Sequence, residues 1–339
     1  MQKNDNIYGS SLLVVIIDKG KGSEILNYVL EFGIRGATAF RAHGTVPNKI
    51  LRLLELGERQ KEVIMIALPI RYENDIVQKL KDRFHFDRPG KGIVFSIALS
   101  AVYGSKHFVQ EPLHTTEAIN DLQYQAVMTI IDKGCTDNIL DFFEDNGFPR
   151  GTVIDAHGSA DKSNALLNLM LESEKDIFLV ITTREEARRL TMLITDYLDL
   201  KSDNSGILAV LNLRQLVGVN FKLPESHGKN ELFVEKNKSS YSAIFAIVEN
   251  DMDEAVIKSA ESAGSTGGTI IHARGSCPYG KAPLFTGVEP EREIVLIIAE
   301  DNKIPDICSK INKDLQLDRP GKGILLVAPL YDTIGLNSQ

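Results

Sequence analysis

Seven residues of this chain occur twice, because residues 87–93 and residues 318–324 both read DRPGKGI. The similarity extends to a third copy of a longer unit. Stretches bounded by glycines recur at offsets of 114 and 117 residues, at 33–44, 147–158 and 264–275. The same offsets relate Gly92 to Gly206 and Gly323, and each of these glycines lies 48 residues after the last glycine of its stretch. Repetition at a fixed spacing indicates one structural unit that is present three times.

Each copy predicts the same order of elements: strand, helix, strand, strand, helix, strand. The first strand is an apolar run at 11–17, 126–131 and 243–248, and a stretch with apolar residues at helical spacing follows it. This order is typical of the ferredoxin-like βαββαβ unit. Because the strands are apolar along almost their whole length, we expect both faces of the sheets to be covered, one by helices and the other by the remaining copies.

The sequence therefore predicts an α+β fold in which a ferredoxin-like βαββαβ unit is repeated three times and closes as a single-chain pseudo-trimer. The predicted repeats are residues 10–104, 126–219 and 243–336, and the predicted linkers are residues 105–125 and 220–242.

Composition narrows the classes of function. The chain has 339 residues and a net charge of −8, which argues against nucleic-acid binding through phosphates and against docking on anionic lipid. The apolar runs have the length of strands, and the N-terminal residues lack the apolar core of a signal peptide. The cysteines Cys135, Cys277 and Cys308 share no spacing typical of a zinc site or a disulfide framework. We expect a soluble, cytoplasmic protein without nucleic-acid partners or direct membrane insertion.

Three features together resemble the PII signal-transduction family, the P-II nitrogen regulatory proteins. The first is a G-x-T stretch before the second strand, at Gly36 to Thr38 and Gly267 to Thr269, of which the second copy keeps Thr152. The second is the glycine six residues after each threonine, where the family's T-loop begins. The third is the G-x-G before the last strand, the family's B-loop, at 90–92 and 321–323. The resemblance covers almost all of the chain outside the linkers.

The resemblance implies a regulatory protein and not an enzyme, with an adenine nucleotide (AMP, ADP, ATP or a cyclic form) as effector and no required cofactor or metal. In the family, the nucleotide lies between subunits, where the B-loop and T-loop base of one face the threonine of the next. Amides of a glycine loop converge on phosphate, and basic side chains add charge-assisted contacts. The implied nucleotide-binding residues are Thr38, Gly44, Arg88, Gly90, Lys91, Gly92, Thr152, Gly158, Thr269, Gly275, Arg319, Gly321, Lys322 and Gly323. A partner protein, such as a membrane transporter or an enzyme, would bind the T-loops and be regulated through them.

The chain departs from the family pattern at several places. The lysine directly after G-x-G is replaced by Ile93, Ile207 and Ile324, and the two arginines beyond the last strand are absent. The variable loop is shorter and lacks the tyrosine that the family modifies with UMP. The second copy departs furthest, because residues 201–206 read KSDNSG where the others read DRPGKG. With less positive charge, a cyclic or less charged adenine nucleotide suits the site as well as ATP, and we expect two competent clefts.

Simpler interpretations stay open beside these. Asp, Pro and Gly in DRPGKGI favour a tight turn that needs no ligand. A polar set ends the second strands: Arg41, His43, Asp155, His157, His272 and Arg274. Because arginine cannot ligate a cation, we interpret this set as hydrogen bonding at the centre of the trimer or as a ligand or loop contact. The loops that follow differ in every copy, which is typical of partner recognition, although their apolar residues equally suit packing on the protein's own surface.

Three functions are therefore considered. The first is a PII-like regulator that senses an adenine nucleotide between domains and acts on a partner through its T-loops. The second is a scaffold of the same shape that has lost nucleotide binding. The third is a metal-tolerance protein of the CutA kind, which has a similar trimeric fold, and fold alone does not decide function.

Overall fold

The computed structural model describes residues 9–34, 37–45, 59–104, 123–148, 151–159, 173–202, 205–219, 239–275 and 290–336. We call residues 9–104 segment 1, residues 123–219 segment 2 and residues 239–336 segment 3. The contact of segment 1 with segment 2 is the 1–2 seam, and the 2–3 and 3–1 seams are named in the same way.

The described elements follow one another in a fixed order within each segment. Segment 1 contains β1 (Ser10–Asp18), α1 (Gly22–Glu31), β2 (Ala37–Gly44), β3 (Arg59–Pro69), a short 3-10 turn (Ile70–Tyr72), α3 (Glu73–Phe84), β4 (Ile93–Leu99) and β5 (Ala101–Tyr103). Segment 2 contains β6 (Tyr124–Asp132), α4 (Thr136–Asp145), β7 (Thr152–Gly158), β8 (Ser173–Thr183), α5 (Arg184–Tyr197), β9 (Ile207–Asn212) and β10 (Gln215–Val217). Segment 3 contains β11 (Tyr241–Glu249), α6 (Asp253–Ser262), β12 (Thr269–Gly275), β13 (Glu291–Glu300), α7 (Ile304–Leu315), β14 (Gly323–Pro329) and β15 (Asp332–Ile334).

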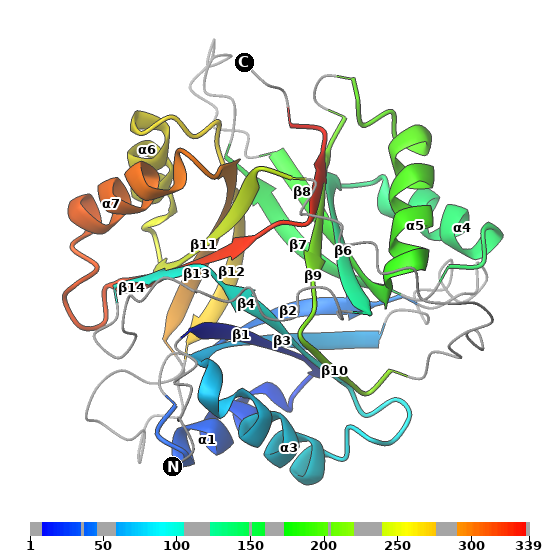
Figure 1. Ribbon diagram of the computed structural model, residues 1–339, viewed down its shortest axis with the longest axis horizontal. Helices are drawn as coiled ribbons and strands as arrows, with labels where there is room; N and C mark the ends of the chain where they lie inside the picture. Colours follow the sequence, from blue (N-terminus) through cyan, green and yellow to red (C-terminus); the bar gives the residue numbers. More distant parts are fainter. Residues whose placement is uncertain are drawn as a thin grey trace, which may run out of the picture.

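All of these strands belong to one antiparallel sheet of 15 strands. Two sets of pairings join the segments. Strands β2, β7 and β12 pair with one another, and the short strands β5, β10 and β15 pair with β14, β4 and β9 of another segment. Figure 1 shows the result, with the strands in the middle and a pair of helices from each segment at the periphery.

The predicted fold class, an α+β pseudo-trimer of three small ferredoxin-like repeats, is therefore wrong. The order of elements does recur along the chain, but the strands do not form three separate four-stranded sheets; hydrogen bonds connect them into one sheet. The physical reason is the cost of open strand edges, which leave backbone N–H and C=O groups unpaired. Each segment ends in a short strand that covers an edge of another segment. All four boundaries between a predicted repeat and a predicted linker fall within three residues of the end of a described element, and the division into domains stays a prediction.

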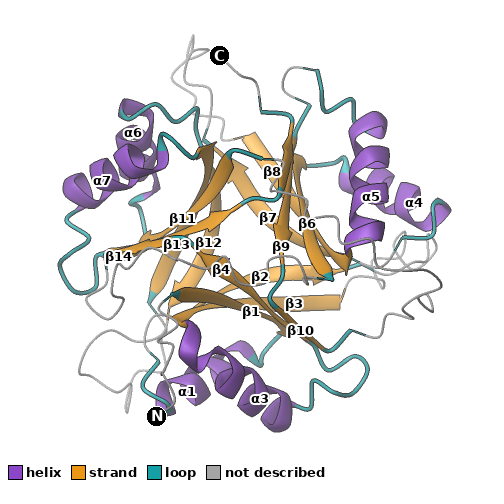
Figure 2. Cartoon of the chain, in the orientation of Figure 1, coloured by secondary structure: helices purple, strands orange, loops and turns teal. Residues whose placement is uncertain are grey.

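The apolar runs are buried on both faces, as their composition predicted. One face carries a core shared by all three segments, which includes Phe40, Phe95, Ile154, Phe245 and Leu326. The opposite faces carry a separate core for each segment between its strands and its two helices. Alternation along a strand divides the residues: Leu12, Val14 and Ile16 enter the shared core, whereas Leu13, Val15 and Ile17 face the helices. Figure 2 shows the helix pairs outside the strands, at the upper left, the right and the bottom of the view.

Candidate ligand site at the seams

The predicted threonines and T-loop glycines meet in pairs across the seams. Gly44 lies opposite Thr152, Gly158 lies opposite Thr269, and Gly275 lies opposite Thr38 in the strand pairings. All three threonines are buried, with 4 to 7% of their surface exposed. The pairing of β2, β7 and β12 therefore places the start of one second strand against the end of another at every seam.

Hydroxyl groups extend this pairing at two seams. At the 1–2 seam, Thr45 N donates to Gly151 O at 3.1 Å and its Oγ1 accepts from Gly151 N at 2.8 Å. At the 2–3 seam, Ser159 N donates to Gly268 O at 2.8 Å and its Oγ accepts from Gly268 N at 2.9 Å. The base of each of these loops is thus fixed to the next segment by two hydrogen bonds.

The two DRPGKGI stretches form tight turns. Lys91 N donates to Arg88 O at 3.3 Å and Lys322 N donates to Arg319 O at 3.2 Å, with Pro and Gly between them. The intervening Gly90 has φ 76°, the value of the third residue of a type II turn. The lysine amides are therefore already engaged within the turn. The basic side chains of both stretches are exposed to solvent.

The second glycine of each G-x-G has a packing role. Gly323 has φ 146°, and a Cβ there would lie 2.6 Å from Ile247 O. The glycine that follows the last short strand of another segment packs against it, because a Cβ on Gly104 would lie 2.8 Å from Gly323 O. Gly218 and Gly335 make the same approach to Gly92 and Gly206. In the region beyond the last strand, where PII proteins have two arginines, this chain has a glycine whose backbone packs against the backbone of another segment.

At the 3–1 seam an arginine connects the turn to Gly275 at the end of β12. Arg292 Nη1 donates to Gly321 O at 3.1 Å, and its side chain lies directly beside Gly275. Lys322 of the same turn pairs with Glu249 at 2.9 Å. The seam therefore gathers Gly275, Arg292 and the 318–323 turn of segment 3 at the strand that carries Thr38 of segment 1.

The other segments keep a cation at the position of Arg292 but use it differently. Lys61 pairs with Asp18 at 2.5 Å, and Lys175 pairs with Asp132. These acids lie at the position of Glu249 in segment 3, opposite the cation in the strand register. Among the described residues, the carboxylate binds the turn lysine instead of the strand cation only in segment 3, and there the strand cation contacts the turn.

A second group of polar contacts crosses all three seams. His43 Nε2 lies 3.2 Å from Asp155 Oδ2, and the rings of His157 and His272 are 5.4 Å apart. Arg274 donates to the buried Glu62 at 2.6 Å. These contacts agree with the interpretation that the polar ends of the second strands hydrogen-bond between segments.

Two equivalent carboxylates of this group have opposite pKa shifts. Burial would raise the pKa of Glu62, but Arg274 and the amides of Gly22 and Gly20 at the start of α1 together hold it below its usual value of 4.5. Glu293 accepts from Met252 N and Asp253 N at the start of α6 in the same way. Its pKa is raised, mainly by burial and then by the charge of Asp253.

The structure thus brings all fourteen predicted residues to the seams or to the turns beside them. Several other positions used in the sequence analysis lie outside the described residues: Gly36, residues 203–204 of the 201–206 stretch, Cys277 and most of the variable loops. The sequence analysis missed Arg292, Glu62 and the contacts of the short end strands. The recurrence of a cation at 61, 175 and 292 is the signal that would have identified the first.

Cavities in the described part of the chain lie mostly elsewhere. One of about 470 Å³ lies between α6 and α7, and among the predicted residues it is lined by Lys322 alone. A second of about 470 Å³ lies at the 2–3 seam and a third of about 380 Å³ near Tyr241; neither is lined by a predicted residue. Within the described ranges no group of three or more His, Cys, Asp and Glu side chains is placed to hold a metal ion. No described helix is long and apolar enough to cross a membrane.

Comparison with known proteins gives no family for the chain. No model of a known protein family matches the sequence, and no curated protein matches it. Among solved structures, aspartate kinase from Synechocystis aligns with 93% of this chain and 56% of its own, at 9% identity and a TM-score of 0.22. The chain thus spans little more than half the length of that protein, and a TM-score this low carries no argument about fold or function.

Proposed function

We propose that the chain is a regulatory protein, not an enzyme, and that it binds an adenine nucleotide at the 3–1 and 1–2 seams and acts on a partner protein through the loops that start there. The observation that supports this most is the arrangement at the 3–1 seam. There the 318–323 turn, Arg292, Gly275 and the strand of Thr38 come from two segments that are remote in sequence.

The chemistry of this seam suits a phosphate. The guanidinium of Arg292 can bind two phosphate oxygens at once, and the exposed Arg319 and Lys322 lie in the adjacent turn. The ion pair of Lys322 with Glu249 is exposed, so a competing phosphate can replace the carboxylate at small cost. The 1–2 seam has the same turn, with Arg88 and Lys91, but its strand cation Lys61 is held by Asp18. We therefore expect the 3–1 seam to bind more tightly.

Thermal unfolding and calorimetry with AMP, ADP, ATP, cyclic AMP and cyclic dinucleotides test the proposal. A ligand at 100 times its dissociation constant adds about 2.7 kcal/mol of apparent stability. Arg292→Gln is expected to weaken the tighter site, because it removes the cation between the turn and Gly275. Lys175→Gln is the matched control, since Lys175 holds the same strand position in segment 2, whose 201–206 stretch lacks G-x-G.

One observation favours the scaffold alternative. The backbone amides of Lys91 and Lys322 already donate hydrogen bonds within the turns, and the second glycine of each G-x-G is closely packed against other backbone. Both features explain these stretches without any ligand. If no nucleotide of the panel changes the melting temperature or gives binding heat, the proposal is refuted and the scaffold function replaces it.

A further inference from the structure

Aromatic side chains join the two helices of segment 1 and the two helices of segment 2. In segment 1, the ring centroids of Tyr28 on α1 and Phe84 on α3 are 5.8 Å apart. In segment 2, Phe142 of α4 stacks on Tyr197 of α5, with ring centroids 4.3 Å apart. Phe84 and Phe142 also pack against the core between strands and helices of their own segment. Aromatic rings therefore fill the groove between the helices in both segments.

The equivalent positions of segment 3 carry small or polar residues. The repeat offset of 117 residues places Ser259 at the position of Phe142. It also places Asp314 at the position of Tyr197. Ser259 Oγ donates to Asp314 Oδ2 at 2.9 Å, so a hydrogen bond joins α6 to α7 where segment 2 has two stacked rings. A serine and an aspartate occupy far less volume than two aromatic side chains.

The groove between α6 and α7 is accordingly hollow. A cavity of about 470 Å³ lies there, and both Ser259 and Asp314 line it. Met252, Ala255 and Leu315 supply apolar lining. Sites for small ligands in proteins typically have volumes of about 300–1,000 Å³ and predominantly apolar walls. The cavity thus has room for a flat ring system at the place where segment 2 has rings of its own.

The charged groups that line this cavity are three lysines and two carboxylates. The lysines are Lys258, Lys310 and Lys322, and the carboxylates belong to Glu249 and Asp314. Glu249 pairs with Lys322 at 2.9 Å, and Asp314 pairs with Lys310 at 2.9 Å. Both carboxylates are therefore engaged by a lysine of the same lining, and Lys258 is the additional cation.

Lys258 is placed to bind an anionic group of a ligand. Its side chain is exposed on α6, and within the described ranges no ion pair engages it. The acids one turn away on either side, Glu254 and Glu261, do not line the cavity. The repeat offsets place Asn27 and Asp141 at this position in segments 1 and 2. A lysine therefore stands here only in the segment whose groove is hollow.

From these observations we propose that the cavity between α6 and α7 binds a small aromatic acid, whose rings take the place of the aromatic pair of segment 2 and whose carboxylate pairs with Lys258. All residues of the lining belong to segment 3, and Lys322 is the single one that the cavity shares with the proposed nucleotide site. The tests below leave Lys322 unchanged and use no nucleotide, so their outcome does not depend on the proposed function. 2-Naphthoate is a suitable probe, because its two fused rings correspond to the two rings of segment 2.

Methyl NMR of the full chain with labelled methionine tests this proposal. Met252 lines the cavity and its signal is assigned by Met252→Leu, while the buried Met65 and Met128 serve as internal references. 2-Naphthoate is expected to shift the Met252 signal in a saturable manner. 2-Naphthamide, its neutral analogue, is expected to bind about threefold more weakly or worse, because it cannot form the ion pair.

The exposed Met192 of segment 2 reports whether the probe is selective. Its signal should move only at concentrations well above those that saturate the Met252 signal. No shift of Met252 with 2-naphthoate, equal affinity for the acid and the amide, or equal midpoints for Met192 and Met252 would each overturn the proposal.

Variants locate the site independently. Ser259→Phe introduces the residue that segment 2 has at this position, and by filling the groove it is expected to abolish the saturable binding of 2-naphthoate. Lys258→Gln changes an exposed residue, so the variant should fold as the wild type does and should bind the probe about threefold more weakly or worse. Lys313→Gln is the matched control, because Lys313 is an exposed lysine of α7 that does not line the cavity. Wild-type affinity in Ser259→Phe, or equal affinity in Lys258→Gln and Lys313→Gln, contradicts the proposal.

Discussion

The carboxylate of Glu62 joins segment 1 to segment 3 and also caps a helix. It accepts from Arg274 at 2.6 Å and from Gly22 N at 2.6 Å, and it is 3% exposed. In Glu62→Gln the amide oxygen can still accept from the helix, but the charge-assisted bond to Arg274 is lost. Such a bond contributes about 1.5–3 kcal/mol, and an anion at a helix N-terminus adds about 0.3–1 kcal/mol. We expect Glu62→Gln to lower the free energy of unfolding by about 2–3 kcal/mol at pH 7.

Glu293→Gln is the matched control, because Glu293 caps α6 at the same position of segment 3. Its neighbour there is His272, whose Nδ1 lies 4.0 Å away and whose side chain is mostly exposed. Because burial and Asp253 raise the pKa of Glu293, its charge opposes folding at pH 7. Glutamine removes that charge and keeps an acceptor for the helix. We therefore expect Glu293→Gln to leave stability unchanged or slightly higher.

Thermal unfolding measures both effects. A chain of this size has an unfolding entropy of about 0.7 kcal/mol per kelvin, so Glu62→Gln should lower Tm by about 3–4 °C. Because the pKa of Glu62 is lowered, its stabilisation is complete above the usual value of 4.5 and is lost as the pH falls through the lowered value. The difference from the wild type should shrink below pH 4.5. Equal losses for the two variants at pH 7, or a difference that does not change in acid, would refute the reasoning.

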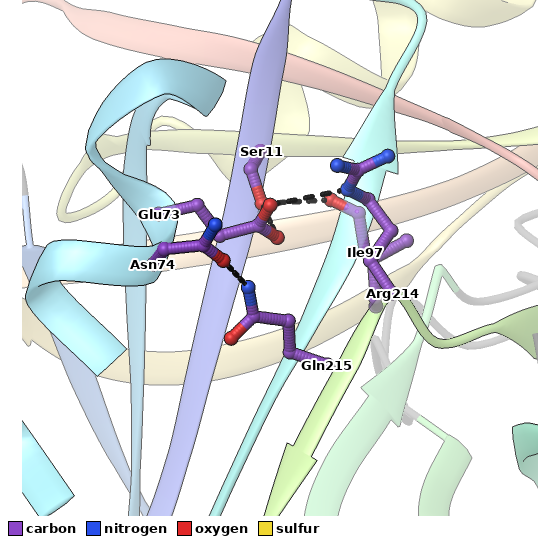
Figure 3. Close-up of polar contacts among 6 residues, drawn as sticks. All are labelled: Ser11, Glu73, Asn74, Ile97, Arg214 and Gln215. Carbon is purple, nitrogen blue, oxygen red and sulfur yellow. Dashed lines mark hydrogen bonds and ion pairs between the residues drawn. The ribbon is translucent and has the colours of Figure 1, made fainter. Parts of the chain in front are cut away.

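Three further predictions concern the seams and the core. Gly218→Ala and Gly335→Ala should each lower the free energy of unfolding by about 3 kcal/mol or more, because a left-handed φ is combined with a collision against the backbone of another segment. Gly20→Ala, with φ 89° and open space around it, should lower it by only about 1 kcal/mol. Urea unfolding of the three variants measures the difference. Arg214→Ala should cost about 3 kcal/mol by leaving Glu73 buried without its cation (Figure 3), far more than Lys79→Ala, which breaks an exposed pair with Asp75; similar costs would contradict the account. In a Cys277→Ser background, a thiol reagent should label the exposed Cys135 at once and Cys308 only after unfolding, because burial raises the pKa of Cys308 to about 12; rapid labelling of both thiols would show that this core is open.

Much of the local structure could be predicted from the sequence, because it depends on residues close together in the chain. The order strand, helix, strand, strand, helix, strand that each copy predicts is the order of the main elements in every segment, for example with the second helix at Glu73–Phe84 in segment 1 and at Ile304–Leu315 in segment 3. The alternation of buried residues along each strand follows from the apolar runs. What failed was the fold class, since it depends on which strand edges pair. The short strands β5, β10 and β15 have three residues each, which is too few for a hydrophobic period to predict them from the sequence.

The candidate site was predictable in part for the same reason. The offsets of 114 and 117 residues correctly aligned Gly44, Gly158 and Gly275, and the structure places each opposite a predicted threonine. The sequence could not show that Arg274 would reach Glu62, which is 212 residues away, or that Arg214 would reach Glu73. Such pairs are set by the geometry of the seams. They also differ from seam to seam, so repeat similarity does not predict them.

Equilibrium dialysis with radiolabelled adenine nucleotides tests the proposed function most directly. The account predicts that the wild type binds two nucleotides per chain with unequal affinity, that Gly321→Asp removes the tighter site, and that Gly321→Asp combined with Gly90→Asp removes both. Both glycines have open space around them, so the new side chains meet no neighbour, and their left-handed φ of 76° and 89° costs each variant only about 1–2 kcal/mol of stability. Absence of binding to the wild type, or binding that the double variant retains, would contradict the account.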